Sequence, residues 1–166
     1  MRQYALAPAW FSGKMVSYHM GWVDEAGRPH ATRTGKLVRP SLALWACGAC
    51  GGDARAGLPA AAAIEWFHNF TLVHDDIQDE DRTRRNRETV WSMWGVPQAI
   101  NAGDAMQTLA FLSVVKEADR PERALRAIEA IAQAGLIVIE GQCLDLELEG
   151  RVDATPRAEL RIFAAR

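Results

Sequence analysis

The amino-acid sequence predicts an all-α protein, a bundle of long, mostly antiparallel helices, and three observations lead to this fold class. Three long stretches, 58–80, 97–118 and 120–150, are rich in alanine, leucine and other residues that favour helices. No segment has the alternating β-branched pattern, bounded by turn residues, that a sheet requires. The 166 residues are 49% hydrophobic, which is ample for the core of one globular domain.

In the first third of the chain, one short helix is expected. Residues 1–34 show turn residues and no strong periodicity, and a basic turn follows at 34–40. An apolar helix at 41–50 ends at paired glycines. Cys47 and Cys50 lie in this helix, and we expect them in the core because cysteine behaves there as a small hydrophobe. Their C-x-x-C spacing leaves a redox pair open as the less favoured alternative, whereas zinc lacks two further ligands.

The later elements follow from proline signals and apolar content. Pro59 stands near the start of the helix at 58–80, whose apolar residues go nearly all round, as in a helix inside a bundle. A charged loop is expected at 81–88, and further helices at 97–118 and 120–150. A last helix is expected to start at the Thr-Pro pair near residue 155.

Composition and charge exclude several functional classes. The 19 Lys and Arg residues are balanced by 21 Asp and Glu residues, which argues against a generally basic nucleic-acid-binding protein. Six Trp and five Phe residues exclude intrinsic disorder. No uninterrupted apolar run reaches about 18 residues, the length a spanning helix needs, and the N-terminus lacks a signal peptide's apolar stretch. We therefore expect no membrane span and a cytoplasmic location.

An acidic run at the end of the helix at 58–80 is the sharpest feature. Asp75 and Asp79 are one turn apart, about 40° around the helix, and Asp76 and Glu80 form a neighbouring column. Like charges at this spacing destabilise a helix unless a cation neutralises them. Mg²⁺ would do so, because it takes carboxylate ligands and bridges to phosphates. The alternative is a solvated, frayed helix end.

Four arginines follow the acidic run: Arg82, Arg84, Arg85 and Arg87. The guanidinium group presents a fork of donors that fits phosphate oxygens. Carboxylates that hold a metal, next to arginines that hold phosphate, predict a diphosphate site. The plain alternative is local salt bridging, which contributes little on a surface.

Five motifs in order resemble those of the trans-isoprenyl diphosphate synthases, the polyprenyl synthetase family. The DDxxD run at 75–79, followed by the arginine pair at 84–85, resembles the family's first aspartate-rich motif. The other matches are GKLVRP at 35–40, EWFH at 65–68, AGD at 102–104 and GQCLD at 141–145. The resemblance covers most of the chain, from about residue 35 onward, and five ordered matches are highly specific.

The resemblance implies site residues and their ligands. Asp75 and Asp79 would ligate Mg²⁺ bound to an allylic diphosphate, with Asp76 hydrogen-bonding in support, and Arg84 would contact that diphosphate. The residues that would hold isopentenyl diphosphate are Lys36, Arg39, His68 and Arg85. The residues that would line the cavity are Phe70, Gln142 and Asp145. Apart from the family, His68 could be a core histidine, Lys36 and Arg39 could belong to a surface turn, and Gln142 and Asp145 could face solvent.

The implied reaction is ionisation of the allylic diphosphate to a carbocation, attack by the isopentenyl double bond, and loss of a proton. The fold implied is a helical bundle around a central cavity, in a homodimer. In the family, a bulky aromatic at the position of Phe70 resembles the floor that limits chain growth. We therefore expect a short product of the farnesyl or geranylgeranyl class.

Three departures from the family pattern are visible. Leu37 replaces an arginine, and RRNRET at 84–89 lacks the family's glycine and proline, so this loop could sit differently. The family's lysine element and second aspartate-rich motif would come after Arg166, and the last helix has no C-cap. We therefore expect residues 1–166 to be the N-terminal part of a single isoprenoid synthase domain. On its own, this piece should lack turnover.

Three other functions compete with this interpretation. A class I terpene cyclase shares DDxxD and the all-α fold but needs no second diphosphate site. An HD-type metal phosphohydrolase would use His68, His74 and Asp75, and it leaves Asp79 and the arginine pair unexplained. A non-catalytic partner subunit would retain the fold and modulate an active homologue.

Overall fold

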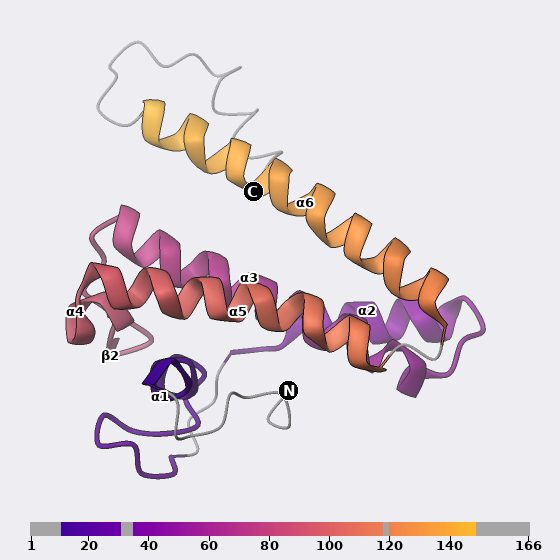
Figure 1. The fold of residues 1–166 in the computed structure, drawn as a ribbon, viewed down its shortest axis with the longest axis horizontal. Coiled ribbons are helices and arrows are strands. Elements are labelled where there is room, and N and C mark those ends of the chain that lie inside the picture. Colours follow the sequence, from indigo (N-terminus) through magenta and orange to yellow (C-terminus); the bar gives the residue numbers. More distant parts are fainter. Residues whose placement is uncertain (1–10, 31–34, 118–119, 149–166) are drawn as a thin grey trace. The chain divides into compact units, whose positions relative to one another are not determined.

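The structure is a computed structural model that describes residues 11–30, 35–117 and 120–148, and it confirms the all-α fold (Figure 1). The helices are α1 (Phe11–His19), α2 (Val38–Ala49), α3 (Leu58–Gln78), α4 (Val90–Trp94), α5 (Val96–Glu117) and α6 (Pro121–Leu148). The minor elements are a 3₁₀ helix, Ala54–Gly57, and two short strands, β1 (Thr83–Arg84) and β2 (Arg87–Glu88). The chain divides into two compact units, one up to residue 119 and one from residue 120 onward.

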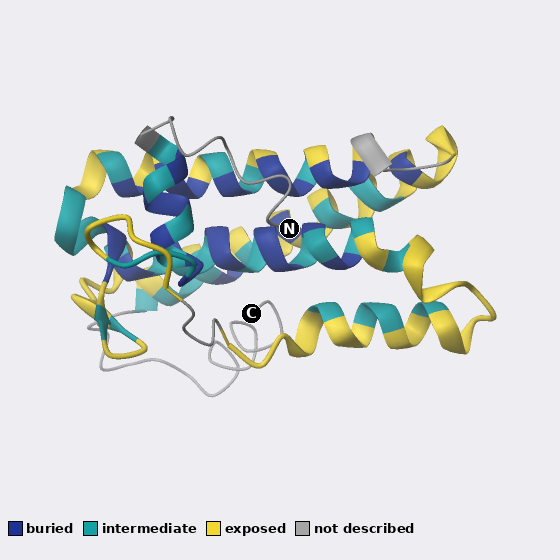
Figure 2. Cartoon of the chain, turned by 90° about the horizontal axis from the view of Figure 1, so that it is seen from below, coloured by how far each residue is buried: buried dark blue, intermediate teal, exposed yellow. Residues whose placement is uncertain are grey.

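The core of the first unit lies between α3 and α5, which run side by side in opposite directions (Figure 1). The buried apolar residues of α3 recur every three or four positions, as on one face of a helix: Ala63, Trp66, Phe70 and Val73. The facing residues of α5 are mostly small or flexible: Ala99, Ala102, Met106, Leu109 and Ala110. Figure 2 shows this burial as dark blue stripes along the helices. The helices predicted at 58–80 and 97–118 are therefore confirmed to within a few residues.

The sequence did not predict α1. Met15, Val16 and Tyr18 are at most 2% exposed, so this nine-residue helix contributes to the core. It escaped prediction because two turns of helix are too short for a clear apolar period. Just after α1, the ring of Trp22 meets that of Trp66 edge to face, with centroids 5.8 Å apart, and this contact docks the segment on α3.

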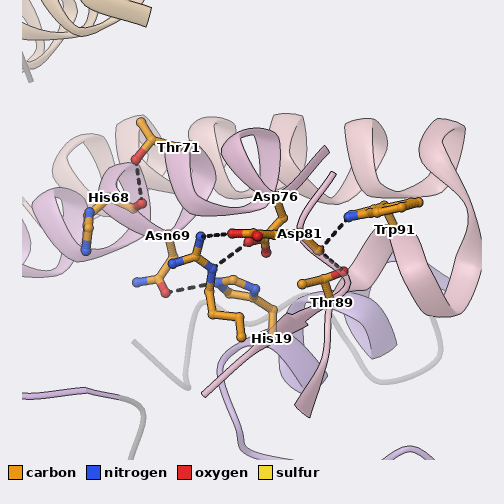
Figure 3. Close-up of polar contacts among 9 residues, drawn as sticks. His19, His68, Asn69, Thr71, Asp76, Asp81, Thr89 and Trp91 are labelled. Atoms are coloured by element: carbon orange, nitrogen blue, oxygen red, sulfur yellow. Dashed lines mark hydrogen bonds and ion pairs between the residues drawn. The ribbon is translucent and has the colours of Figure 1, made fainter. Parts of the chain in front are cut away.

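The charged loop predicted at 81–88 folds as a small hairpin that leads into α4. Thr83 pairs with Glu88 and Arg84 with Arg87 in an antiparallel ladder. The Thr89 hydroxyl and the Trp91 indole N–H both donate to the backbone carbonyl of Asp81 at 2.8 Å (Figure 3). The prediction of no strands is therefore wrong for these few residues, because side-chain contacts to one carbonyl hold the loop in a regular turn.

The segment predicted as an apolar core helix is real, but it is not core. α2 contributes no buried residue, and Leu42 and Trp45 are 60% and 70% exposed. Cys50 is exposed, and Cys47 is half-buried with its thiol 3.4 Å from the carbonyl oxygen of Asp53. The expected core position of these cysteines is therefore wrong, because α2 packs on α3 along only one face.

The second unit contains α6, which confirms the helix predicted at 120–150 and begins at Pro121, where proline is tolerated. By length and composition alone, α6 could cross a membrane. This is weak evidence, because a core helix of a globular protein passes the same test. The predicted last helix lies outside the described residues.

Candidate functional site

The three predicted aspartates lie at the C-terminal end of α3, in different surroundings. Asp79 caps the helix, and its backbone N–H donates to the carbonyl of Asp75 at 2.8 Å. Asp79 is exposed, Asp75 is half-buried, and Asp76 is only 1% exposed. Asp75 and Asp79 can therefore reach a ligand in solvent, whereas Asp76 points into the protein.

Asp76 forms an ion pair with Arg84 of the hairpin (Figure 3). The Nε of Arg84 donates to Oδ1 of Asp76 at 2.5 Å, and Nη2 of Arg84 lies 3.9 Å from Oδ2 of Asp81. Burial raises the pKa of Asp76 to about 6, against the lowering effect of Arg84. Oδ2 of Asp76 is buried and has no hydrogen-bond partner among the described residues. Asp76 therefore orients the Arg84 side chain through Oδ1, and its Oδ2 could still accept a hydrogen bond.

The carboxylates fit a hard divalent cation in part. Among the described residues, no three His, Cys, Asp or Glu side chains come close enough to enclose a metal ion. Asp75 and Asp79 supply two oxygen donors one helical turn apart, and Mg²⁺ is commonly held by one or two carboxylates with waters and phosphate oxygens completing the shell. The donor set therefore suits Mg²⁺ that arrives together with a diphosphate.

The turn of the hairpin presents Arg85. Arg85 and Asn86 have φ angles of 55° and 60°, and positive φ at both central residues is what a tight two-residue hairpin requires. Asn86 stands where the family has glycine, and asparagine tolerates this conformation better than most residues. The loop therefore forms a regular turn although it lacks the family's glycine. A Cβ atom on Gly35 would lie 3.4 Å from Nη2 of Arg85, so the turn reaches the GKLVRP segment.

The predicted cationic residues gather around His68 on α3. Nη1 of Arg39 lies 3.2 Å from Nε2 of His68. Arginine can only donate, so Nε2 of His68 accepts, and the ring is neutral with its proton on Nδ1. Burial, together with the nearby charges of Arg39, Arg85 and Arg84, lowers the pKa of His68 to about 4. Lys36 is exposed next to Gly35.

A buried polar chain below this cluster was not predicted. Nε2 of His19 lies 3.1 Å from Oδ1 of Asn69, whose amide donates to the backbone and side-chain oxygens of Glu65 at 2.8 and 3.0 Å (Figure 3). Burial, then Arg85, lowers the pKa of His19 to about 3. Glu65 and Asn69 are i,i+4 neighbours on one helix, so their contact could have been predicted from the sequence. No signal in the sequence places His19 there.

The AGD motif faces the acidic run across the α3–α5 interface. Gly103 is buried, and a Cβ atom there would overlap the imidazole ring of His74, the residue before Asp75. Nε2 of His74 lies 3.3 Å from the carbonyl oxygen of Ile100 and 3.7 Å from Oδ1 of Asp104. The absent side chain at Gly103 therefore lets the end of α3 lie close against α5.

The predicted lining residues fall into two places. Phe70 is 7% exposed and stacks edge to face between Phe67 and His74, with ring centroids 5.1 and 4.9 Å away. Gln142 and Asp145 lie on α6, in the second unit, so their approach to the acidic run stays a prediction.

Known proteins resemble the chain over most of its length. A family model described as "Polyprenyl synthetase" matches residues 20–164. A (2E,6E)-farnesyl diphosphate synthase of Mycobacterium tuberculosis H37Rv is 45% identical over 139 residues, 84% of this chain and 38% of that protein. A geranylgeranyl diphosphate synthase of the same strain is 41% identical over 152 residues, 92% of this chain and 43% of that protein.

The solved structures agree with these relatives. A polyprenyl synthetase from Streptomyces coelicolor A3(2) superposes with a TM-score of 0.90 at 36% identity, over 99% of this chain and 48% of that one. A geranylgeranyl pyrophosphate synthetase from the archaeon Geoglobus acetivorans superposes with a TM-score of 0.80 at 35% identity, over 93% and 47%. The chain thus spans less than half the length of these relatives. With its ordered motifs and its fold in agreement, the chain belongs to the polyprenyl synthetase family.

Proposed function

We propose that the chain forms part of a Mg²⁺-dependent prenyltransferase that condenses an allylic diphosphate with isopentenyl diphosphate to a farnesyl- or geranylgeranyl-type product. One observation supports the proposal: α3 and the hairpin bring together two groups of charged and polar residues that could each hold a diphosphate. Asp75 and Asp79 share the end of α3 with Asp76, which binds Arg84, and His68 lies near Arg39 and Arg85. The relatives are named as farnesyl and geranylgeranyl diphosphate synthases, which supports the same reaction.

The first group would bind the allylic diphosphate. Asp75 and Asp79 would hold Mg²⁺, which when bound neutralises charge on the leaving diphosphate. Arg84 is aimed by Asp76, so its terminal N–H groups can meet diphosphate oxygens without a large side-chain rearrangement. Fixed donors of this kind favour departure of the diphosphate, because they are already in place where its negative charge develops.

The second group would bind isopentenyl diphosphate. Arg39, Arg85 and the exposed Lys36 supply positive charge, and neutral His68 offers its Nδ1–H as a donor. A class I terpene cyclase would have no use for this second group, which is why the prenyltransferase is favoured. The buried aromatic side chains of α3 would shield the carbocation from water.

The wider features of the protein are proposals as well. Residues 1–166 would be the N-terminal part of a single isoprenoid synthase domain, in a cytoplasmic homodimer. The lysine element and the second aspartate-rich motif would be supplied by further sequence, and Gln142 and Asp145 would line the same cavity from α6. Reading the codons downstream of Arg166 tests this directly, and a stop codon there would contradict it.

Pyrophosphate binding tests the site on the chain as it stands. By calorimetry with Mg²⁺ present, we expect Asp79→Asn to weaken pyrophosphate binding about tenfold or more, because a carboxylate ligand is lost. Glu80→Gln removes the same charge from the next residue, which has no assigned role, and should change the affinity less than twofold. Equal effects of the two variants would contradict a specific metal-binding role for Asp79.

Prenyl transfer tests the reaction itself. The chain joined to its downstream sequence should convert geranyl diphosphate to longer products only when isopentenyl diphosphate is added. Product formation from the allylic diphosphate alone would indicate a cyclase. Stimulation of a separate full-length homologue, without turnover of its own, would indicate a partner subunit.

A further inference from the structure

Arg87 stands directly opposite Arg84 in the hairpin. The two residues pair across the antiparallel ladder, and residues so paired project their side chains on the same face of a sheet. Like charges in this arrangement repel each other. The hairpin would therefore be destabilised, and Arg84 pushed away from Asp76, unless the second guanidinium is held elsewhere.

Arg87 is held by the end of α1. Its Nη1 donates to the carbonyl of Tyr18 at 3.1 Å and its Nη2 to the carbonyl of Val23 at 3.0 Å. Its guanidinium carbon lies 4.0 Å from the centroid of the Tyr18 ring, a close cation–π contact. The carbonyl of Tyr18 lies in the last turn of α1, where helix carbonyls carry partial negative charge, so it is suited to receive this cation. Both terminal nitrogens of the Arg87 guanidinium therefore donate hydrogen bonds on the side away from Arg84.

The α1 segment is itself anchored, so the contact fixes the hairpin in place. The Tyr18 hydroxyl donates back to the carbonyl of Glu88 at 3.0 Å, and His19 contacts Asn69 on α3 at 3.1 Å. A closed set of contacts therefore runs from α3 through α1 to β2 and, by way of Arg84 and Asp76, back to α3. Arg85 lies in the turn between Arg84 and Arg87, so these contacts also restrain its position.

We infer that Arg87 is a positioning residue for the diphosphate-binding arginines: it does not touch the ligand, but it sets the hairpin so that Arg84 and Arg85 face the site. This inference rests on the proposed function, because it assumes that the ligand of Arg84 and Arg85 is a diphosphate. Arg82, on the same loop, has its guanidinium carbon 5.2 Å from the centroid of the Trp91 ring in α4, so it serves as the matched control.

The first test needs no ligand. In ¹H–¹⁵N spectra of arginine side chains, the Nε–H signal of Arg84 reports its bond to Asp76, and Arg84→Lys identifies the signal. We expect Arg87→Lys to shift or broaden this signal, because lysine is a point charge that cannot bridge both carbonyls as the planar fork does. Arg82→Lys should leave it in place. An unmoved Arg84 signal in Arg87→Lys would overturn the inference.

The second test separates position from charge by calorimetry with pyrophosphate and Mg²⁺. Arg87→Lys keeps the charge, yet we expect about tenfold weaker binding, the scale of one lost hydrogen bond to a charged group. Arg82→Lys should bind like the original chain. Arg87→Lys with unchanged affinity would contradict the positioning role. If the original chain binds no pyrophosphate, the proposed function fails, and the Arg84 signal still decides the role of Arg87.

Discussion

At the scale of single residues, the three aspartates of one motif differ because of burial. Asp76 is turned inward against Arg84, and its pKa is raised to about 6, whereas Asp79 is exposed. The spacing of the motif shows which carboxylates share a helix face. Which of them is removed from water depends on the hairpin that folds over that face.

His19 offers a pH prediction. Burial lowers its pKa to about 3, so in acid the unfolded chain binds a proton near pH 6.5 that the folded chain does not take up until much lower pH. The stability that comes from neutral His19 is present above pH 6.5 and is lost as the pH falls toward 3. Between pH 6.5 and 5.5 the free energy of unfolding should fall by about 1 kcal/mol from this residue.

The matching measurement is urea unfolding of the chain and of His19→Gln at several pH values. His68, with its pKa lowered to about 4, acts in the same direction, and Asp76, with its pKa raised, acts in the opposite direction between about pH 4 and 6. The comparison with His19→Gln cancels both. Equal pH dependence of the two proteins would show that His19 is not buried in the neutral form.

Gly103 gives a packing prediction. Gly103→Ala should destabilise the first unit by about 1–2 kcal/mol, since the new Cβ would overlap the His74 ring. Gly48→Ala is the control, because nothing lies within 4 Å of a Cβ there and alanine favours the helix by about 0.5–1 kcal/mol. In a His74→Ala background the cost of Gly103→Ala should shrink. Stabilisation by Gly103→Ala in urea unfolding would contradict the close packing.

At the scale of elements, the hairpin between α3 and α4 depends on its turn. Asn86→Gly should change the free energy of unfolding by only a few tenths of a kcal/mol, because asparagine and glycine both accept positive φ. Asn86→Val should cost about 1–2 kcal/mol, since a β-branched residue is strained there. Urea unfolding measures both, and tolerance of valine would mean that the turn adopts another conformation.

The long helices α3, α5 and α6 were predicted closely, whereas the short α1 and α4 were not. A long helix repeats its apolar pattern over many turns, so the pattern stands out from chance. Nine residues in α1 and five in α4 cannot repeat it, and contacts such as that of Trp91 with Asp81 hold them instead. The hairpin likewise depends on contacts with α1 and α3 rather than on strand-forming residues.

At the scale of the whole molecule, the chain spans less than half of its relatives, and this leads to an activity prediction. The 166-residue chain alone should give no detectable prenyl transfer, because one carboxylate pair cannot complete the metal cluster expected from the family. Incubation with geranyl and isopentenyl diphosphates, followed by chromatography of the products, measures this. Turnover by the pure chain would overturn the prediction.

The length of the product in the complete protein gives a second prediction at this scale. Phe70 lies within an aromatic row on α3 with Phe67 and His74. If Phe70 is the floor of the product cavity, Phe70→Ala should lengthen the products, whereas Phe67→Ala, its neighbour in the row, should not. An unchanged product distribution in Phe70→Ala would contradict the floor role.

The sequence by itself determined the helical class and the family, and it predicted the candidate site residues, because these depend on local periodicity and on ordered motifs. Only the tertiary structure decided that Asp76 is buried on Arg84, that His68 accepts from Arg39, and that His19 joins Asn69 beneath them. The physical reason is that protonation, desolvation and hydrogen-bond direction depend on neighbours brought together by folding. Those neighbours come from outside α3: from α1, 50 residues away in the case of His19 and Asn69, from α2, and from the hairpin that follows α3.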